Sequence, residues 1–161
     1  MQRTLDPARL GDHLDRLYRA AWALCGSRQD AEDLVQETYA RVLSRPRFLR
    51  NEDEFGYLLR ALRNTFLNAK RTETRRPRTS PLPEGVDFVE ERASTRPEVA
   101  LEAKEVFEAV SALPEAFRDA VVAVDVAGLS YAEAAKALRV PEGTVMSRLY
   151  RGRRQIAQAL S

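Results

Sequence analysis

The chain has 161 residues, 44% of them hydrophobic, which is enough for one domain or for two small ones with a real core. Its 26 basic and 24 acidic residues give a formal charge of only +2, so net charge alone does not identify a nucleic-acid-binding protein. The single cysteine, Cys25, and the single histidine, His13, exclude an internal disulfide, a cysteine-rich zinc site and a multi-histidine metal site.

Targeting and catalytic signals are also missing from the sequence. No apolar run approaches the ~20 residues of a membrane span, and the first residues have no apolar core of a signal peptide. No nucleophile–base pair or metal-binding constellation is present. We therefore expect a cytoplasmic protein that is not an enzyme, needs no cofactor or metal and does not insert directly into a membrane.

Residues 8–76 divide into three expected helices. The first, about 8–24, has one apolar stripe of Leu10, Leu14, Leu17, Tyr18, Ala21 and Trp22. Gly26 ends it, and Ser27 with Asp30 caps a second helix that buries Leu34, Val35, Tyr39, Val42 and Leu43 and stops ahead of Pro46. Asn51 with Glu54 caps a third, which buries Phe55, Leu58, Leu59, Leu62, Phe66 and Leu67.

Charge is sorted along this first unit. The stretch 30–37 holds four acids and no base, whereas 60–78 holds seven bases against the single acid Glu73. Acids in a first helical turn are favoured by the helix dipole, but Glu37 lies too far along the helix for that explanation. Seven bases likewise exceed what a helix end requires, so this segment favours a surface that follows DNA phosphates over a merely solvated face.

Residues 77–97 separate the two units. They contain four of the eight prolines and show no sustained helical or strand period, which indicates a flexible linker. We therefore divide the chain into a first unit (1–76), a linker (77–97) and a second unit (98–161), and expect the two units to tumble semi-independently.

The second unit ends in a helix-turn-helix pattern. Its first two helices are expected to bury Val99, Val106, Val110 and Leu113, then Phe117, Ala120, Val121 and Val124. Ser130 and Glu133 form a capping box for a short helix with the inner face Ala134, Ala135 and Leu138. A last helix after Pro141 buries Val145, Leu149, Ile156 and Leu160, and its other face carries hydroxyls and arginines. Such a pair of helices is typical of reading a DNA major groove, although an ordinary helical hairpin with solvated arginines is the alternative.

Three motifs in this order resemble the extracytoplasmic-function sigma factors of bacterial RNA polymerase. Asp30–Tyr39 (DAEDLVQETY) is similar to the segment that docks on polymerase, and Leu58–Asn64 to the promoter-melting helix. Leu113–Glu115, Gly128–Tyr131 and Gly143–Val145 are similar to sigma region 4. The resemblance implies an all-α fold of two small helical domains, sigma region 2 and sigma region 4, joined by a flexible linker.

The resemblance also implies roles for named residues. The first unit would dock on the clamp helices of the largest polymerase subunit through Asp30, Glu32, Asp33, Gln36 and Glu37. The protein would also contact the flap of the second-largest subunit. Its 44–53 loop and third helix would contact promoter DNA at the −10 region through Phe48, Tyr57, Arg60, Arg63, Asn64, Asn68, Lys70, Arg71, Arg75 and Arg76. Phe48 and Asn64 match the positions that capture a flipped base, although Phe48 could equally close the core.

The last helix would read the −35 region through Thr144, Ser147, Arg148, Tyr150, Arg151 and Arg154. Two positions depart from the family pattern. Met146 stands where a basic residue is common, which predicts altered −35 recognition. Tyr57 stands where tryptophan is common, and it keeps an aromatic face that can stack.

Together these features predict an alternative sigma factor that binds core RNA polymerase and directs promoter recognition and DNA melting, with a cognate anti-sigma factor as a further possible partner. Two alternatives stay open. One is a sigma-like mimic that sequesters an anti-sigma factor, and the other is a simple helix-turn-helix regulator. The basic helix end argues against a mimic, and the presence of the first unit argues against a simple regulator.

Overall fold

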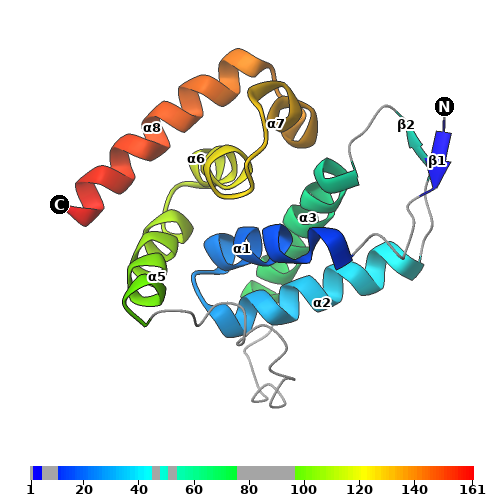
Figure 1. Ribbon diagram of the computed structural model, residues 1–161, viewed down its shortest axis with the longest axis horizontal. Helices are drawn as coiled ribbons and strands as arrows, with labels where there is room; N and C mark the ends of the chain where they lie inside the picture. The colour runs from blue at the N-terminus through cyan, green and yellow to red at the C-terminus, as the bar shows by residue number, and fades with distance from the viewer. Residues whose placement is uncertain (1, 5–10, 45–47, 51–53, 76–96) are drawn as a thin grey trace.

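The computed structural model describes residues 2–4, 11–44, 48–50, 54–75 and 97–161 (Figure 1). In chain order the elements are β1 (Gln2–Thr4), α1 (Leu14–Cys25), α2 (Arg28–Ser44), β2 (Phe48–Arg50), α3 (Glu54–Arg75), α5 (Pro97–Ser111), α6 (Glu115–Val121), the π-helix η2 (Val122–Val126), α7 (Tyr131–Leu138) and α8 (Glu142–Leu160). The all-α class is confirmed. The two short strands, which pair antiparallel with Gln2 opposite Arg50, were not predicted.

The first unit is a bundle of α1, α2 and α3, and the end of α1 and the start of α2 lie at the predicted capping residues. Gly26 ends α1 in the left-handed region at φ 73°, and its N–H donates to the Trp22 carbonyl at 2.7 Å. The Asp30 N–H donates to the Ser27 hydroxyl at 3.4 Å at the start of α2. The helix α1 begins at Leu14 rather than near residue 8, after a short 3₁₀ turn at 11–13.

The helix-turn-helix consists of α7 and α8, as predicted. The Ser130 hydroxyl accepts from the Glu133 N–H at 3.1 Å, and the Glu133 carboxylate accepts from the Ser130 N–H at 2.9 Å, so the capping box is complete. Arg139 ends α7 at φ 58°, and Pro141 directly precedes α8. These joints define the turn between α7 and α8.

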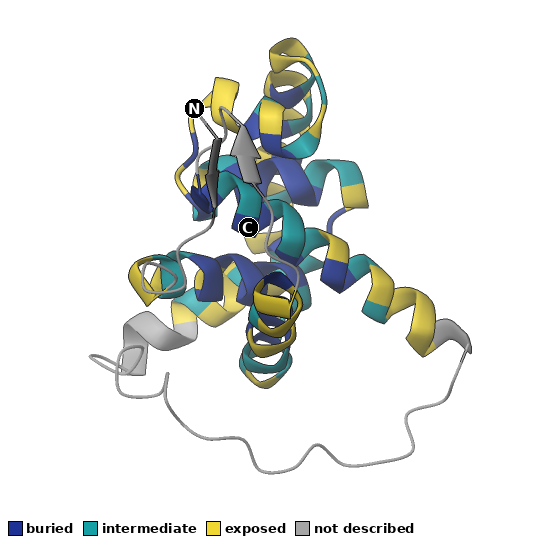
Figure 2. Ribbon diagram, turned by 90° about the vertical axis from the view of Figure 1, so that its right-hand side faces the viewer, coloured by how far each residue is buried: buried dark blue, intermediate teal, exposed yellow. Residues whose placement is uncertain are grey.

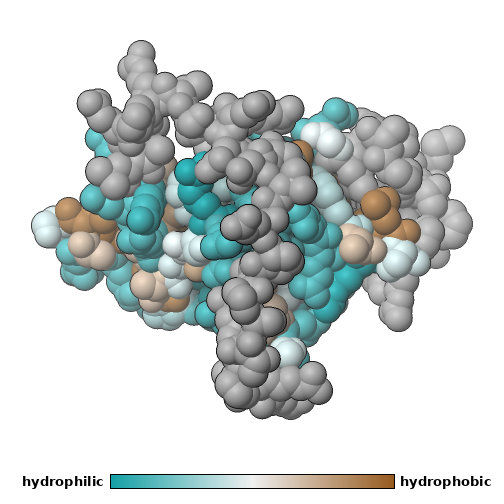
Figure 3. All heavy atoms as spheres, turned by 90° about the horizontal axis from the view of Figure 1, so that it is seen from below, coloured by the Kyte–Doolittle hydropathy of each residue, from teal (hydrophilic) through white to brown (hydrophobic). Residues whose placement is uncertain are grey.

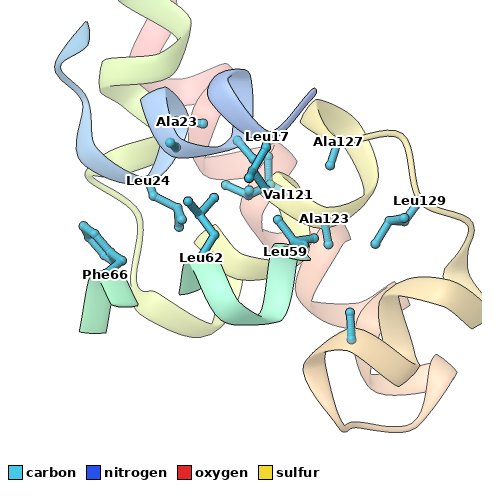
Figure 4. Packing of buried hydrophobic residues seen from close by; sticks show 14 of the residues in the cluster. Leu17, Ala23, Leu24, Leu59, Leu62, Phe66, Val121, Ala123, Ala127 and Leu129 are labelled. Carbon is cyan, nitrogen blue, oxygen red and sulfur yellow. The ribbon is translucent and has the colours of Figure 1, made fainter. Parts of the chain in front are cut away.

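The two units pack against each other around one hydrophobic core. Figure 4 shows Leu17 and Leu59 of the first unit beside Val121 and Ala123 of the second, and all four side chains are buried. The Trp22 ring meets the Phe107 ring edge-on, with 4.7 Å between the centroids. We expected semi-independent units. The structure differs because α1 packs on one side against α2 and α3 of its own unit and on another against α5 and η2 of the second unit.

Burial otherwise follows the predicted stripes, with three exceptions. Figure 2 shows buried positions where the helices meet and exposed ones on their outer faces. Leu43 (48% exposed) and Leu160 (47% exposed) were expected in the core, but both lie in last helical turns that extend past it. Val106 is 38% exposed because α5 turns its neighbours Phe107 and Val110 inward. Val99, Leu10 and Asn51 lie outside the residues whose side chains are described, and the linker lies outside the described residues apart from Pro97.

Candidate polymerase and DNA interfaces

The outer face of α2 carries the residues predicted to bind polymerase. Gln36 and Glu37 are exposed, and Glu37 accepts a hydrogen bond from Arg41 at 3.0 Å, one turn further along. Asp30, Glu32 and Asp33 are half-buried on the same helix. Among the described residues visible in Figure 3, hydrophilic side chains predominate on the face seen from below, and hydrophobic ones form small separate areas. An acidic, polar surface of this kind suits a basic protein partner.

A shallow groove adjoins this acidic face, between α2 and α3. Its charged lining consists of four acids and one base: Asp30, Asp33, Glu37, Glu73 and Lys70. Cys25 also lines the groove, and burial is the main cause that raises the pKa of its thiol to about 12. A thiol with so high a pKa stays protonated at neutral pH, and Cys25 packs against the hydrophobic core.

The far part of α3 carries the exposed side chains predicted to contact DNA. Asn64, Asn68, Lys70 and Arg71 are all exposed. The Lys70 ammonium lies 5.5 Å from the centre of the Phe66 ring, which leaves its charge at the surface. The side chain of Arg75, at the end of α3, and the whole of Arg76 lie outside the described residues.

A hollow at the middle of α3 brings together three residues predicted to act near the −10 region. Tyr57, Arg60 and Asn64 line it, together with Arg41 of α2 and Arg139 of the second unit. An aromatic ring, an amide and several guanidinium groups are the kinds of group that stack on and read a nucleobase. The 44–53 loop is described only at Ser44 and in β2, which contains Phe48, and the side chain of Phe48 lies outside the described residues.

The recognition helix α8 presents most of its predicted DNA-binding residues to solvent. Ser147, Tyr150, Arg151 and Arg154 are exposed, with Tyr150 at 66%, while Thr144 and Arg148 are half-buried. Met146 is also exposed, at 46%. On the opposite side, Val145 and Leu149 are buried against the rest of the unit. The helix therefore has a packed face and a free face rich in cations, as reading a DNA groove requires.

The helix α8 also has one basic residue that serves the fold. The Arg153 guanidinium donates to both carboxylate oxygens of Asp125 in η2, at 2.6 and 2.9 Å. Hydrogen bonding to Asp125 raises the pKa of Arg153, and this ion pair links α8 to η2. Arg153 is not one of the residues of the second unit that were predicted to bind DNA.

Two of the predicted DNA-binding arginines are bonded to the second unit. Arg60 donates to the Ala137 carbonyl at 3.2 Å and to the Lys136 carbonyl at 3.0 Å, in the last turn of α7. Arg63 donates to Asp119 at 2.6 Å and to Glu115 at 3.3 Å, both in α6. The structure thus brings Arg60 and Arg63 to the contact between the units, away from the exposed residues further along α3.

Sequence reasoning missed the other members of this contact. Arg16 of α1 donates to the Ala127 carbonyl at 2.7 and 3.1 Å, and its guanidinium stacks 3.8 Å above the Phe55 ring. Arg118 and Asp119 are buried in α6. The only signal in the sequence was two adjacent opposite charges inside the apolar stripe of Phe117, Ala120 and Val121, which does not reveal their partner.

The chain matches two described families of bacterial transcription proteins. Residues 10–76 match Sigma-70 region 2, and residues 103–156 match Sigma-70, region 4. The ECF RNA polymerase sigma factor SigE of Mycolicibacterium smegmatis is 38% identical over 152 residues, which cover 92% of this chain and 59% of that protein. The RNA polymerase sigma-H factor of Pseudomonas aeruginosa is 33% identical over 145 residues, covering 82% of this chain and 74% of that protein. The chain therefore spans less than two thirds of the SigE relative.

Solved structures share the fold at lower identity. The sigma factor RpoE of Bartonella quintana, in complex with the anti-sigma factor NepR, has a TM-score of 0.69 at 24% identity and covers 95% of this chain and 94% of its own. CnrH, in complex with the cytosolic domain of CnrY, has a TM-score of 0.65 at 21% identity, covering 95% of this chain and 85% of its own. None of the described helices combines the length and apolar character that crossing a bilayer requires.

Proposed function

Because this chain belongs to the extracytoplasmic-function sigma factors of bacterial RNA polymerase, we propose that it binds core polymerase, directs it to promoters and helps to melt the DNA there. It would work in the cytoplasm as a binding subunit that leaves the chemistry to polymerase. The observation that carries this proposal is the sorting of surface charge, with the acids of the stretch 30–37 partly or fully exposed on α2 and exposed bases on the far part of α3 and on α8.

The acidic face of α2 is the proposed docking site for the clamp helices of the largest polymerase subunit. Glu37 is the best probe of this contact, because it is exposed and its partner Arg41 is also on the surface. Asp33 is half-buried in the groove beside α3, so its substitution should cost stability as well as affinity. The second unit would contact the flap of the second-largest subunit.

The helix α8 is the proposed reader of the −35 region. Its free face offers Arg151 and Arg154 to bases or phosphates and Ser147 to a phosphate near the helix N-terminus. Arginine that bridges to guanine contributes specificity, whereas a phosphate contact contributes affinity on any sequence. The exposed thioether of Met146 has no hydrogen-bond donor for either purpose, but its apolar surface suits a thymine methyl group.

The third helix is the proposed element for melting and base capture at the −10 region. Asn64 is exposed beside the hollow that Tyr57 also lines, so its amide is available to the edge of a flipped base. Lys70 and Arg71 would hold phosphates of the same strand. Asn64→Ala should therefore leave closed-complex binding nearly intact and reduce the reactivity of unpaired thymines to permanganate. Melting equal to that of the parent would remove the base-capture role.

Run-off transcription is the direct test of the proposed function. Core polymerase would be combined with the chain on promoters enriched from genomic DNA, and polymerase alone would serve as the control. Specific transcripts that require the chain are the expected result. A chain that binds an anti-sigma factor but supports no transcript would instead be a sigma-like mimic, and one that binds DNA without polymerase would be a simple regulator.

An anti-sigma factor is a further proposed partner. RpoE of Bartonella quintana, which shares this fold, was solved with the anti-sigma factor NepR. Such a partner would cover the acidic face of α2, the DNA-binding faces or both. Co-purification with a genomically neighbouring gene product, followed by loss of transcription on its addition, would identify it.

A further inference from the structure

The free face of α8 has two flanks of different chemistry. Because an α-helix turns by about 100° per residue, Met146 and Tyr150 lie one turn apart and only about 40° from each other around the helix. Both side chains are exposed, at 46% and 66%. Arg151 lies about 140° round the helix from Met146, and Arg148 lies on the same side as Arg151. The helix therefore presents an apolar flank (Met146 and Tyr150) and a cationic flank (Arg148 and Arg151).

The cation of α8 that lies closest in angle to Met146 is already paired within the protein. Arg153 follows Met146 by seven residues, which is about two helical turns. Its guanidinium donates to both carboxylate oxygens of Asp125, at 2.6 and 2.9 Å. A group that approaches the apolar flank therefore meets a thioether and a phenol ring, and the nearest positive charge is offset by a carboxylate.

The apolar flank begins in the part of α8 that enters a DNA groove. In a helix-turn-helix the N-terminal residues of the second helix contact the edges of the bases, and Met146 lies in the second turn of α8, which begins at Glu142. Gly143, one turn earlier, has no side chain, and nothing in the described part of the chain lies within 4 Å of the position of a Cβ there. The helix backbone beside Met146 can therefore approach the base pairs closely.

Thymine is the base whose major-groove edge suits a thioether. It carries an apolar methyl group there, beside its hydrogen-bond acceptor, whereas the purines and cytosine are distinguished by their donors and acceptors. A thioether has no donor and is only a weak acceptor, so it cannot read those other edges. Burial of one methyl group against an apolar surface corresponds to about a fourfold gain in affinity.

We propose that the apolar flank of α8 selects thymine at one or two −35 positions through its methyl group, and that Met146 determines this preference. The inference rests on the proposed function, because it takes α8 as the reader of the −35 region. The charges favour DNA as the occupant, since exposed Arg151 and Arg154 on the same free face attract a polyanion. The arginines supply affinity, and the apolar flank adds a base preference that salt does not screen.

The first experiment locates the preferred thymine. Core polymerase with the parent chain, or with the Met146→Ala variant, is bound to promoter duplexes whose −35 region has been randomised, and the bound duplexes are sequenced. The parent should enrich thymine at one or two positions, and Met146→Ala should lose this enrichment. Leu160→Ala is the matched control, because Leu160 is 47% exposed at the far end of the same helix. It should select the same bases as the parent.

The second experiment removes the methyl group alone, by placing deoxyuridine at the selected thymine. The parent holoenzyme should bind the uracil duplex about fourfold more weakly than the thymine duplex, with the same ratio at low and high salt. Met146→Ala should bind the two duplexes equally. Met146→Lys should also lose the discrimination, while the slope of its logarithmic affinity against logarithmic salt concentration steepens by about one. Deoxyuridine at a thymine outside the −35 region should change none of these affinities.

The outcomes separate this inference from the proposed function. Equal binding of the thymine and uracil duplexes by the parent would overturn the inference and leave the apolar flank to a protein partner. Full discrimination by Met146→Ala would overturn it as well, because another side chain would then read the methyl group. A parent that transcribes from its promoters but ignores the methyl group loses only this inference. A parent that supports no transcript loses the proposed function itself.

Discussion

Gly152 lies where α8 packs closely against α6, and replacing it by alanine should displace the two helices. An added Cβ would lie 2.7 Å from Val121 Cγ2 and 3.3 Å from the Phe117 carbonyl oxygen. Unstrained carbon–carbon contacts are about 3.5–4.0 Å, so the two groups would have to separate by about 0.8–1.3 Å. Overpacking of a well-packed contact costs about 1–3 kcal/mol in the free energy of unfolding.

The matched control is Gly143→Ala in the same helix, because nothing lies within 4 Å of a Cβ at that position. Both substitutions gain helix propensity, worth up to about 1 kcal/mol, so the difference between them isolates the cost of overpacking. For a chain of this length, about 1–3 kcal/mol corresponds to a Tm about 2–12 °C lower for Gly152→Ala than for Gly143→Ala. Thermal unfolding followed by circular dichroism measures it. A Gly152→Ala variant that melts at or above Gly143→Ala would refute this packing argument.

Three other predictions concern the cap, the polymerase face and the DNA contacts. Ser130→Ala should lower stability by about 1 kcal/mol. Hydrogen bonds from Ser130 lower the pKa of Glu133. The stabilisation that the Glu133 carboxylate gives is therefore present above the ordinary carboxyl pKa and is lost as the pH falls through the lowered pKa. Glu133→Gln should lose less stability than the parent on acidification, and an equal loss would contradict this. Glu37→Lys should weaken binding to core polymerase in a titration with nearly unchanged Tm, and unchanged affinity would remove the docking assignment. Lys70→Gln should reduce by about one the slope of the logarithm of promoter affinity against the logarithm of salt concentration. If Arg151 bridges to guanine, Arg151→Ala should cost roughly 1–3 kcal/mol of binding free energy and relax base preference at one or two −35 positions. Equal losses of affinity on all sequences would make Arg151 a phosphate contact.

Local signals in the sequence predicted the helices well, because their causes are local. The capping box at Ser130 and the glycine at Gly26 act through neighbours a few residues away, and both joints lie where the sequence indicated. The contact between the units could not be predicted in this way. Arg63 and Asp119 are 56 positions apart, and nothing in the basic character of the segment 60–78 distinguishes an arginine that faces DNA from one that faces another helix.

Helical periodicity predicted most of the buried side chains but not where each buried stripe ends. Periodicity identified Phe55, Leu58 and Leu62 correctly, since all three are fully buried. It overestimated burial at Leu43 and Leu160, because a stripe does not show where the partner helix ends. The exposed face of α8 and the acidic face of α2 follow from the same periodicity, whereas their roles with DNA and polymerase stay predictions.

The π-helix η2 has a consequence for the orientation of the whole helix-turn-helix. The Ala127 N–H donates to the Val122 carbonyl, five residues back, instead of to the usual fourth residue. The segment therefore holds one residue more than a regular helical turn, and each residue of an α-helix turns the chain by about 100°. Through this phase shift Val122 and Ala123 lie in the core while Asp125 meets Arg153 on α8. Deletion of one residue from 122–126 should therefore turn the chain that follows by about 100° relative to α6 and change the direction in which the exposed side chains of α8 point.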